Sequence, residues 1–184
     1  MKPRHIPNLI TVFRFLLVPP VVLLLVNDRP GAALLLFGVA GLSDGLDGFL
    51  AKRYHWTSRL GALMDPLADK LLLVSSFVTL GWLGWLPHWL VVLVVLRDLV
   101  IVGGAIVFHM RVERLEAAPS LVSKLNTFAQ ILLVLVAIFN HGIQLIPVQW
   151  LDALVYLVLA TTLWSGFDYV WTWGRLAWSK RGRR

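Results

Sequence analysis

Long runs of apolar residues, separated by short polar stretches, dominate the pattern of this chain. Six of these runs approach or exceed the roughly 20 residues that a helix needs to cross a lipid bilayer. Because backbone polar groups in hydrocarbon must pair within their own segment, each run is predicted to be an α-helix. The predicted spans are 7–26, 31–52, 62–82, 86–109, 121–139 and 149–173. The pattern therefore predicts an all-α integral membrane protein with six transmembrane helices.

The composition agrees with this class. Of the 184 residues, 58% are hydrophobic and 15% are charged, and the mean hydropathy is +0.77. The absence of cysteine excludes disulfides and thiolate metal sites. No linker or low-complexity tract divides the chain, which we expect to form one domain over residues 1–184. The N-terminal apolar run lacks a convincing cleavage site for a signal peptide, so we interpret it as the first span.

The basic residues indicate an orientation. Most of them fall on one predicted face: Lys2, Arg4, Lys52, Arg53, Arg59, Arg111, Arg114, Lys180, Arg181, Arg183 and Arg184. The opposite loops, 27–30, 83–88 and 140–148, contain only Arg29. The positive-inside rule places the basic face and both termini in the cytoplasm. The net charge of +7 is thus a sign of topology, and nucleic-acid binding is a poor alternative because no separate basic domain exists.

Four aspartates lie at the cytoplasmic ends of two predicted spans. Asp44 and Asp47 end the second span, and Asp65 and Asp69 begin the third. A carboxylate in or near hydrocarbon is costly and usually marks a functional site. The spacings of three and four residues put each pair on one helix face. Four carboxylates suit a hard divalent cation such as Mg²⁺ or Mn²⁺, whereas salt bridges to Lys70, Arg97 or Lys124 are the structural alternative.

Small residues accompany the aspartates. Gly48 and Ala51 are spaced to share one helix face, and Gly61 precedes Asp65 by one turn. Their small side chains leave room for a nucleotide to lie beside the carboxylates. Close packing between membrane helices is the alternative explanation for each glycine taken alone.

The run from Asp44 to Asp69 resembles the signature of the CDP-alcohol phosphotransferase family, D-x-x-D-G-x-x-A-R-x8-G-x3-D-x3-D. The matching positions are Asp44, Asp47, Gly48, Ala51, Lys52, Gly61, Asp65 and Asp69. Every spacing fits, and the pattern of six spans extends the resemblance over the chain. Lys52 departs from the signature, because it keeps the charge of the family's arginine but lacks its bidentate fork.

The resemblance implies a reaction and roles for these residues. Such enzymes use an alcohol to displace CMP from a CDP-linked lipid, and they need divalent metal. Asp44, Asp47, Asp65 and Asp69 would hold Mg²⁺ or Mn²⁺, as two ions, with Asp69 also acting as general base. Gly48, Ala51, Lys52 and Gly61 would bind the CDP-lipid. The resemblance further implies a homodimer. We expect the protein in the bacterial cytoplasmic (inner) membrane, with the active site facing the cytoplasm, because the positive-inside rule places the aspartates on that side.

Other polar residues within apolar segments suggest where the acceptor alcohol binds. Arg14 lies in Asn8-x-x-Thr11-x-x-Arg14, which resembles the start of bacterial phosphatidylglycerophosphate synthases and CDP-diacylglycerol-type cardiolipin synthases. We expect Arg14 and Arg97 to contact phosphate. The alternatives are an interface anchor for Arg14 and a structural pair of Arg97 with Asp98 or Asp168. Lys124 and Asn126 belong to a segment that resembles the cardiolipin synthase branch.

We therefore predict transfer of phosphatidyl from CDP-diacylglycerol to a glycerol-type hydroxyl. Asn126 stands where relatives that use glycerol 3-phosphate tend to have a second lysine, which favours phosphatidylglycerol as acceptor and cardiolipin as product. Glycerol 3-phosphate, giving phosphatidylglycerophosphate, is the second choice. A divalent-cation transporter and an inactive membrane scaffold are the alternatives of a different class.

Overall fold

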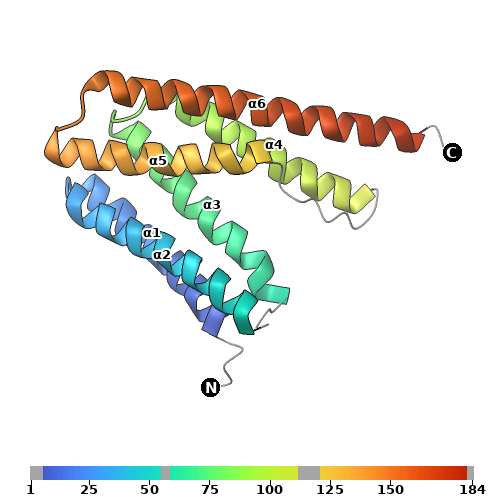
Figure 1. Cartoon of the computed structure of the whole chain (residues 1–184), viewed down its shortest axis with the longest axis horizontal. Coiled ribbons are helices and arrows are strands. Elements are labelled where there is room, and N and C mark those ends of the chain that lie inside the picture. Colours follow the sequence, from blue (N-terminus) through green and yellow to red (C-terminus); the bar gives the residue numbers. More distant parts are fainter. Residues whose placement is uncertain (1–5, 55–58, 112–120, 182–184) are drawn as a thin grey trace. The chain divides into compact units, whose positions relative to one another are not determined.

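The computed structural model describes residues 6–54, 59–111 and 121–181, and it describes side chains over 10–45, 67–104 and 121–172. These residues form six α-helices and no β-strand (Figure 1). In chain order the helices are α1 (Ile6–Val26), α2 (Pro30–Tyr54), α3 (Arg59–Trp82), α4 (His88–Arg111), α5 (Leu121–Ile143) and α6 (Val148–Arg181). The all-α prediction is confirmed for the described residues.

The helix bounds match the predicted spans closely, with two exceptions. Helix α5 ends at Ile143 instead of residue 139, and α6 continues to Arg181 instead of ending at residue 173. Hydropathy locates the apolar part of a helix, whereas backbone hydrogen bonding continues into polar sequence beyond it. Helix α1 likewise runs through Pro19 and Pro20 without ending.

Two segments of the described chain are long and apolar enough to cross a membrane. They are Leu121–Ile143 and Val148–Thr172. Shorter apolar helical segments are Ile10–Val26 and Pro30–Gly45. The further expectation of six membrane spans, with both termini in the cytoplasm, stays a prediction.

The chain divides into two compact units. The first contains α1, α2, α3 and residues 134–145, and the second contains α4, residues 121–133 and α6. The expectation of a single domain over residues 1–184 stays a prediction.

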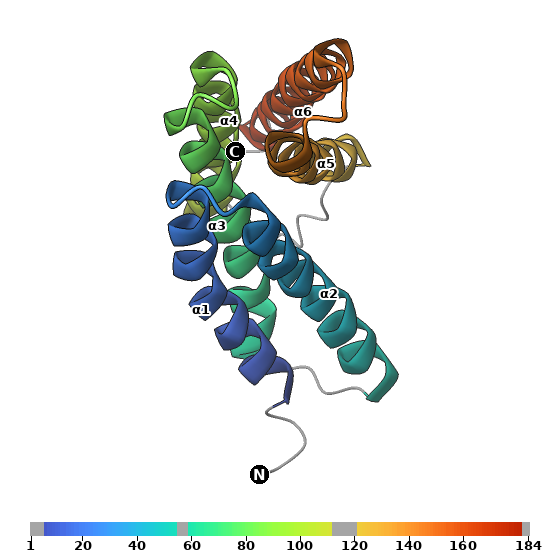
Figure 2. The same cartoon turned by 90° about the vertical axis from the view of Figure 1, so that its left-hand side faces the viewer.

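In the first unit, α1 packs against both α2 and α3 (Figure 2). Apolar side chains from the three helices are buried there, including Leu25, Ala33, Phe37 and Phe77. Burial of these side chains removes apolar surface from water or lipid, and their packing fixes the helices against one another. This packing holds α1 against α2 and α3.

The turns of the first unit are short and capped. Asp28 adopts a left-handed conformation with φ 55° at the end of α1, and the Arg29 amide donates to the Leu24 carbonyl at 2.9 Å. Pro30 then begins α2, a position at which its fixed φ and missing N–H are tolerated. Gly84, with φ 77°, ends α3 in the same way, because glycine adopts this conformation without strain.

In the second unit, α4 packs against α6. Leu90, Val94, Leu133 and Val158 are fully buried. Polar side chains are buried alongside them on all three helices of the unit: Arg97, Asp98, Ser123, Asn126, Gln130, Thr162 and Ser165. A buried polar cluster in so apolar a unit requires internal hydrogen bonds.

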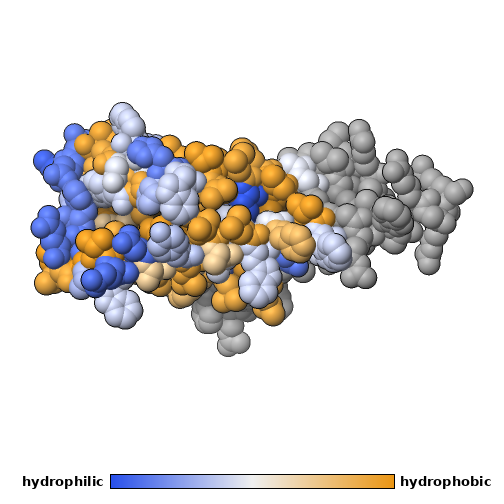
Figure 3. Space-filling view, turned by 90° about the horizontal axis from the view of Figure 1, so that it is seen from above, coloured by the Kyte–Doolittle hydropathy of each residue, from blue (hydrophilic) through white to orange (hydrophobic). Residues whose placement is uncertain are grey.

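Large apolar side chains cover much of the outer surface. Leu35, Leu42, Leu121, Phe128 and Phe167 are each at least 66% exposed. On the face drawn in Figure 3, hydrophobic residues are widespread among the described ones. Exposed apolar surface of this extent is typical of a protein that contacts lipid.

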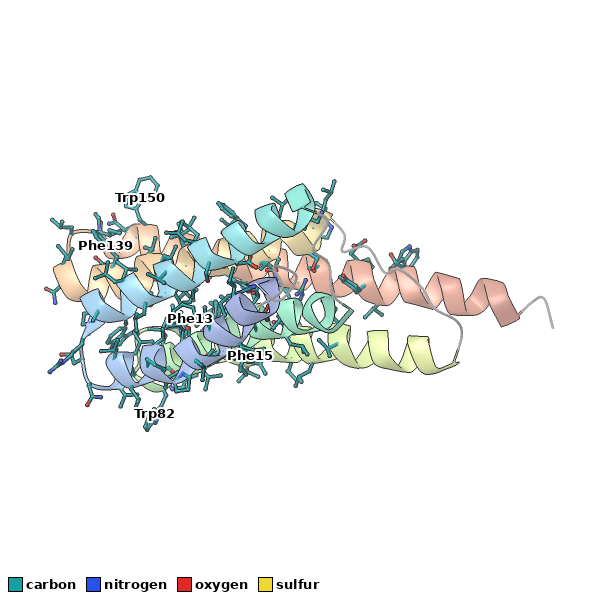
Figure 4. All side chains as sticks on the ribbon, turned by 90° about the horizontal axis from the view of Figure 1, so that it is seen from below. Phe13, Phe15, Trp82, Phe139 and Trp150 are labelled. Atoms are coloured by element: carbon teal, nitrogen blue, oxygen red, sulfur yellow. The ribbon has the colours of Figure 1, made fainter. Side chains whose placement is uncertain are left out.

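Tryptophans lie near the helix ends where an aromatic belt is expected. Trp82 at the end of α3 and Trp150 at the start of α6 both point away from the helices (Figure 4). They are 75% and 68% exposed, respectively. Amphipathic rings at such positions suit the boundary between lipid and water.

Candidate active site

Arg14 brings two of the predicted site residues together in the first unit. Its Nη1 atom donates to Oδ1 of Asp44 at 2.7 Å and also to Oδ1 of Asp69. The three side chains come from α1, α2 and α3, so this contact depends on the packing of those helices. The sequence predicted that the aspartates of α2 and α3 lie side by side, and Asp44 and Asp69 do.

The three side chains differ sharply in exposure. The Arg14 side chain is 1% exposed, whereas those of Asp44 and Asp69 are 46% and 45% exposed. The guanidinium therefore lies beneath the carboxylates, which remain open to solvent or ligand on their other side. A buried arginine needs such anionic partners, because removing its charge from water is otherwise costly.

The remaining signature residues lie on the same two helices. Asp47, Gly48, Ala51 and Lys52 belong to α2, and Gly61 and Asp65 belong to α3. Their side chains lie outside the described ones. Their predicted roles in binding metal and CDP-lipid stay predictions.

The described carboxylates suit a hard divalent cation. Asp44 and Asp69 offer oxygen ligands, the type that Mg²⁺ prefers, and both already converge on one cation, Arg14. Among the side chains of residues 10–45, 67–104 and 121–172, no group of three or more potential ligands forms. A complete metal site would thus also need the two aspartates whose side chains lie beyond those ranges, Asp47 and Asp65.

Arg97 lies at the centre of a closed cluster in the second unit. Its Nη1 atom donates to Asp98 at 2.8 Å, and Nη2 donates to the hydroxyls of Ser123, at 2.7 Å, and Ser165. These contacts join α4, α5 and α6. The side chains of Arg97 and Asp98 are 5% and 8% exposed. Of the two structural pairs considered from the sequence, the structure contains the one with Asp98.

Asn126 lies one turn beyond Ser123 on the same helix. It is fully buried, and its Oδ1 accepts hydrogen bonds from Thr161 and Thr162, each at 2.9 Å. Lys124, by contrast, is exposed. The two residues that the sequence grouped as acceptor-binding therefore lie in different environments.

Gln130 is a buried residue that sequence reasoning missed. It is fully buried, yet neither its amide nitrogen nor its amide oxygen has a hydrogen-bond partner among the described residues. The amide nitrogen of Asn126, one turn earlier, likewise has no hydrogen-bond partner among the described residues. Polar residues spaced by three and four along an otherwise apolar helix, Ser123, Asn126 and Gln130, were the available signal.

Comparison with known proteins identifies the family. A family model described as CDP-alcohol phosphatidyltransferase matches residues 4–164. The chain belongs to the CDP-alcohol phosphatidyltransferase family. The matched range includes Arg14, Asp44 and Asp69 in the first unit and Arg97, Asp98 and Ser123 in the second. It ends one residue before Ser165.

Two kinds of relative in this family resemble the chain to the same degree. The human protein named cardiolipin synthase (CMP-forming) is 30% identical over 190 residues, which cover 91% of this chain and 61% of the human protein. The chain thus spans about three-fifths of that relative's length. The Escherichia coli K12 protein named CDP-diacylglycerol–glycerol-3-phosphate 3-phosphatidyltransferase is 31% identical over 175 residues, covering 90% of this chain and 93% of that protein.

Proposed function

We propose that this protein transfers a phosphatidyl group from CDP-diacylglycerol to a glycerol-type hydroxyl and releases CMP. The observation that carries the proposal is the convergence of Asp44 and Asp69 on Arg14, with both carboxylates half exposed. This is a pre-formed anionic site between α2 and α3, within the segment that matches the phosphatidyltransferase family. The names of the human and E. coli relatives describe reactions of the same class.

The proposed roles follow the family signature. Asp44, Asp47, Asp65 and Asp69 hold Mg²⁺ or Mn²⁺, which neutralises charge on the diphosphate when bound. Gly48, Ala51 and Gly61 make room for the cytidine part, and Lys52 reaches the diphosphate. Asp69 takes the proton of the acceptor hydroxyl as its oxygen bonds to the β-phosphorus of CDP-diacylglycerol, the one that carries the diacylglycerol. The bond from that phosphorus to the bridging oxygen breaks, and CMP leaves with the bonding electrons.

We further propose that the six helices all span a membrane, with the basic face, both termini and the aspartates in the cytoplasm. The helices are 21 to 34 residues long, which is enough to cross hydrocarbon. The exposed apolar side chains and the tryptophans near helix ends support this arrangement. In a bacterial inner membrane, soluble CMP would leave on the cytoplasmic side while the lipids stay in the bilayer. A homodimer is proposed from family resemblance alone.

For the acceptor, phosphatidylglycerol is our first choice. Asn126 is neutral and fully buried against two threonine hydroxyls, where a lysine would place a charge. Lys124 would add an exposed cation near the acceptor phosphate.

Glycerol 3-phosphate is the second candidate acceptor. One observation favours it: the E. coli relative that is named for this acceptor is covered over 93% of its length, against 61% for the human cardiolipin synthase. The two candidates differ in charge and size at the acceptor, but they share the donor, the released CMP and the proposed catalytic aspartates.

The test is product analysis with purified protein in detergent. CDP-diacylglycerol and Mn²⁺ are supplied with phosphatidylglycerol, glycerol 3-phosphate, inositol phosphate or serine in parallel. Cardiolipin formation with phosphatidylglycerol is the expected result. Product from glycerol 3-phosphate alone would reverse the order of the acceptors. No product with any acceptor, together with Mn²⁺ flux in liposomes that lack CDP-lipid, would contradict the proposal and favour a transporter.

A further inference from the structure

Arg14 occupies the position of a cation between two carboxylates. Its side chain is 1% exposed, and a single nitrogen, Nη1, contacts both Asp44 and Asp69. An arginine Nη carries two hydrogens, so one nitrogen can donate to both carboxylates at once. The contact is an integral part of the packed first unit, since α1, α2 and α3 each supply one partner.

We propose that Arg14 is a built-in counter-cation that joins α1 to Asp44 and Asp69 in the metal-free protein and competes with a divalent metal for these carboxylates. The proposal rests on the metal site of the proposed function. It assigns Arg14 a role that differs from the phosphate contact expected from the sequence.

The balance of charge supports this role. Two carboxylates and one guanidinium sum to −1, because −2 + 1 = −1, whereas the carboxylates alone would sum to −2. Without Arg14, the two anions from α2 and α3 would repel each other in the metal-free protein. When Arg14 contacts both carboxylates, its positive charge partly neutralises them and so weakens their attraction for a second cation.

The geometry defines how the competition arises. The carboxylates are exposed on the side away from Arg14, so a metal ion would approach from there and share them with the buried guanidinium. Like charges at such short range repel strongly in a partly buried site. Arg14 should therefore stabilise the protein without metal and weaken the binding of metal, both through the same contacts.

The experiment compares Mn²⁺ binding by the full-length wild-type protein, Arg14→Gln and Arg14→Lys in detergent, with no CDP-lipid present. Free Mn²⁺ is measured by electron paramagnetic resonance, and thermal unfolding is followed in EDTA. Arg29→Gln is the matched control, because it removes an exposed positive charge from the same unit. It should behave as the wild type in both measurements.

Arg14→Gln should bind Mn²⁺ about tenfold more tightly than the wild type and should unfold several degrees lower in EDTA. The Mn²⁺ affinity and the unfolding temperature of Arg14→Lys should lie between those of the wild type and Arg14→Gln, because lysine keeps the charge but lacks the guanidinium fork. If Arg14→Gln does not fold, the Mn²⁺ affinity of Arg14→Lys alone tests the proposal. Unchanged or weaker Mn²⁺ binding by the folded variants would overturn the proposal.

The outcome can be separated from that of the proposed function. The Mn²⁺ measurement contains no lipid substrate, so a failure to release CMP leaves the predicted difference between wild type and Arg14→Gln intact. Conversely, a wild-type protein that releases CMP but whose Arg14 variants bind Mn²⁺ no better would keep the proposed function and refute the counter-cation. A role of Arg14 in phosphate contact alone predicts that second pattern.

Discussion

Two buried arginines, one in each compact unit, have very different surroundings. Arg14 contacts two carboxylates that are each nearly half exposed, whereas Arg97 contacts one carboxylate and two hydroxyls that are themselves buried. Both guanidiniums are almost completely removed from solvent. The first cluster is therefore open on its anionic side, and the second is closed.

This difference separates a site that can receive a ligand from a network that holds helices together. An open pair of carboxylates can share a cation from outside, which is what chemistry at a diphosphate requires. In the closed cluster, the charge of Arg97 is already balanced by Asp98, and its Nη2 atom donates to Ser123 and Ser165, whereas its buried Nε has no hydrogen-bond partner among the described residues. The contacts of Arg97 thus favour the structural alternative over a headgroup contact, and the following predictions test this.

The largest effect is expected at the open cluster. Asp69→Asn keeps the size of the side chain but removes the proposed general base, so CMP release should fall by about 10²- to 10⁴-fold. Binding of CDP-diacylglycerol should stay close to that of the wild type. The measurements are CMP release at saturating acceptor and equilibrium binding of the donor lipid.

Asp152→Asn is the matched control for this variant, because Asp152 is an exposed aspartate on α6 outside both clusters. It should turn over at the wild-type rate. Normal turnover by Asp69→Asn would refute the assignment of the general base and would remove the functional contrast between the clusters.

The next effect is on stability at the closed cluster. Arg97→Met removes the guanidinium that pairs with buried Asp98, and the expected loss is about 3–5 kcal/mol of unfolding free energy. The double variant Arg97→Met/Asp98→Leu should recover much of this loss, because an apolar pair of similar volume needs no counter-charge. Unfolding of the three proteins in detergent measures both effects.

Turnover by the double variant then decides between the two explanations for Arg97. If the cluster is structural, the folded double variant should retain its KM for the acceptor. A large rise in KM with an unchanged kcat would show that Arg97 contacts the acceptor headgroup. Both arginines would then belong to ligand sites, and the second cluster would not be purely structural.

The smallest effect is expected next to the closed cluster, at Asn126. Its Oδ1 accepts from both Thr161 and Thr162, so either Thr→Val variant leaves one donor in place and should lose about 0.5–1.5 kcal/mol. The double variant should lose more than the sum of the single losses, because only then is the buried oxygen without a donor. Additive losses in thermal unfolding would show that the two hydroxyls act independently.

Hydropathy predicted most of the helical architecture. Apolar runs located all six helices to within a few residues at most of their ends, because lipid-compatible segments must be helical. The ends of α5 and α6 were placed too early, since a helix continues through polar residues such as those before Ile143 and Arg181. Hydropathy has no signal for where such an extension stops.

The contacts within the clusters were harder to predict. The sequence predicted that Asp44 and Asp69 lie near each other, because α2 and α3 are joined by a short turn and the two residues lie at similar distances from it. Their shared partner, Arg14, could not be predicted, since it depends on how α1 packs against α2 and α3. Gln130 was missed for a related reason: its spacing from Ser123 and Asn126 places it on their helix face, but its burial depends on how its neighbours pack.

The central claim is that the aspartates of α2 and α3 form a metal-dependent site for transfer from CDP-diacylglycerol. The most direct measurement is CMP release from CDP-diacylglycerol and phosphatidylglycerol by the wild-type protein, first in EDTA and then after addition of Mn²⁺ or Mg²⁺. The account predicts release only when the metal is present, and loss of that release in Asp44→Asn. Equal release in EDTA and in Mn²⁺, or full metal-dependent release by Asp44→Asn, would contradict it.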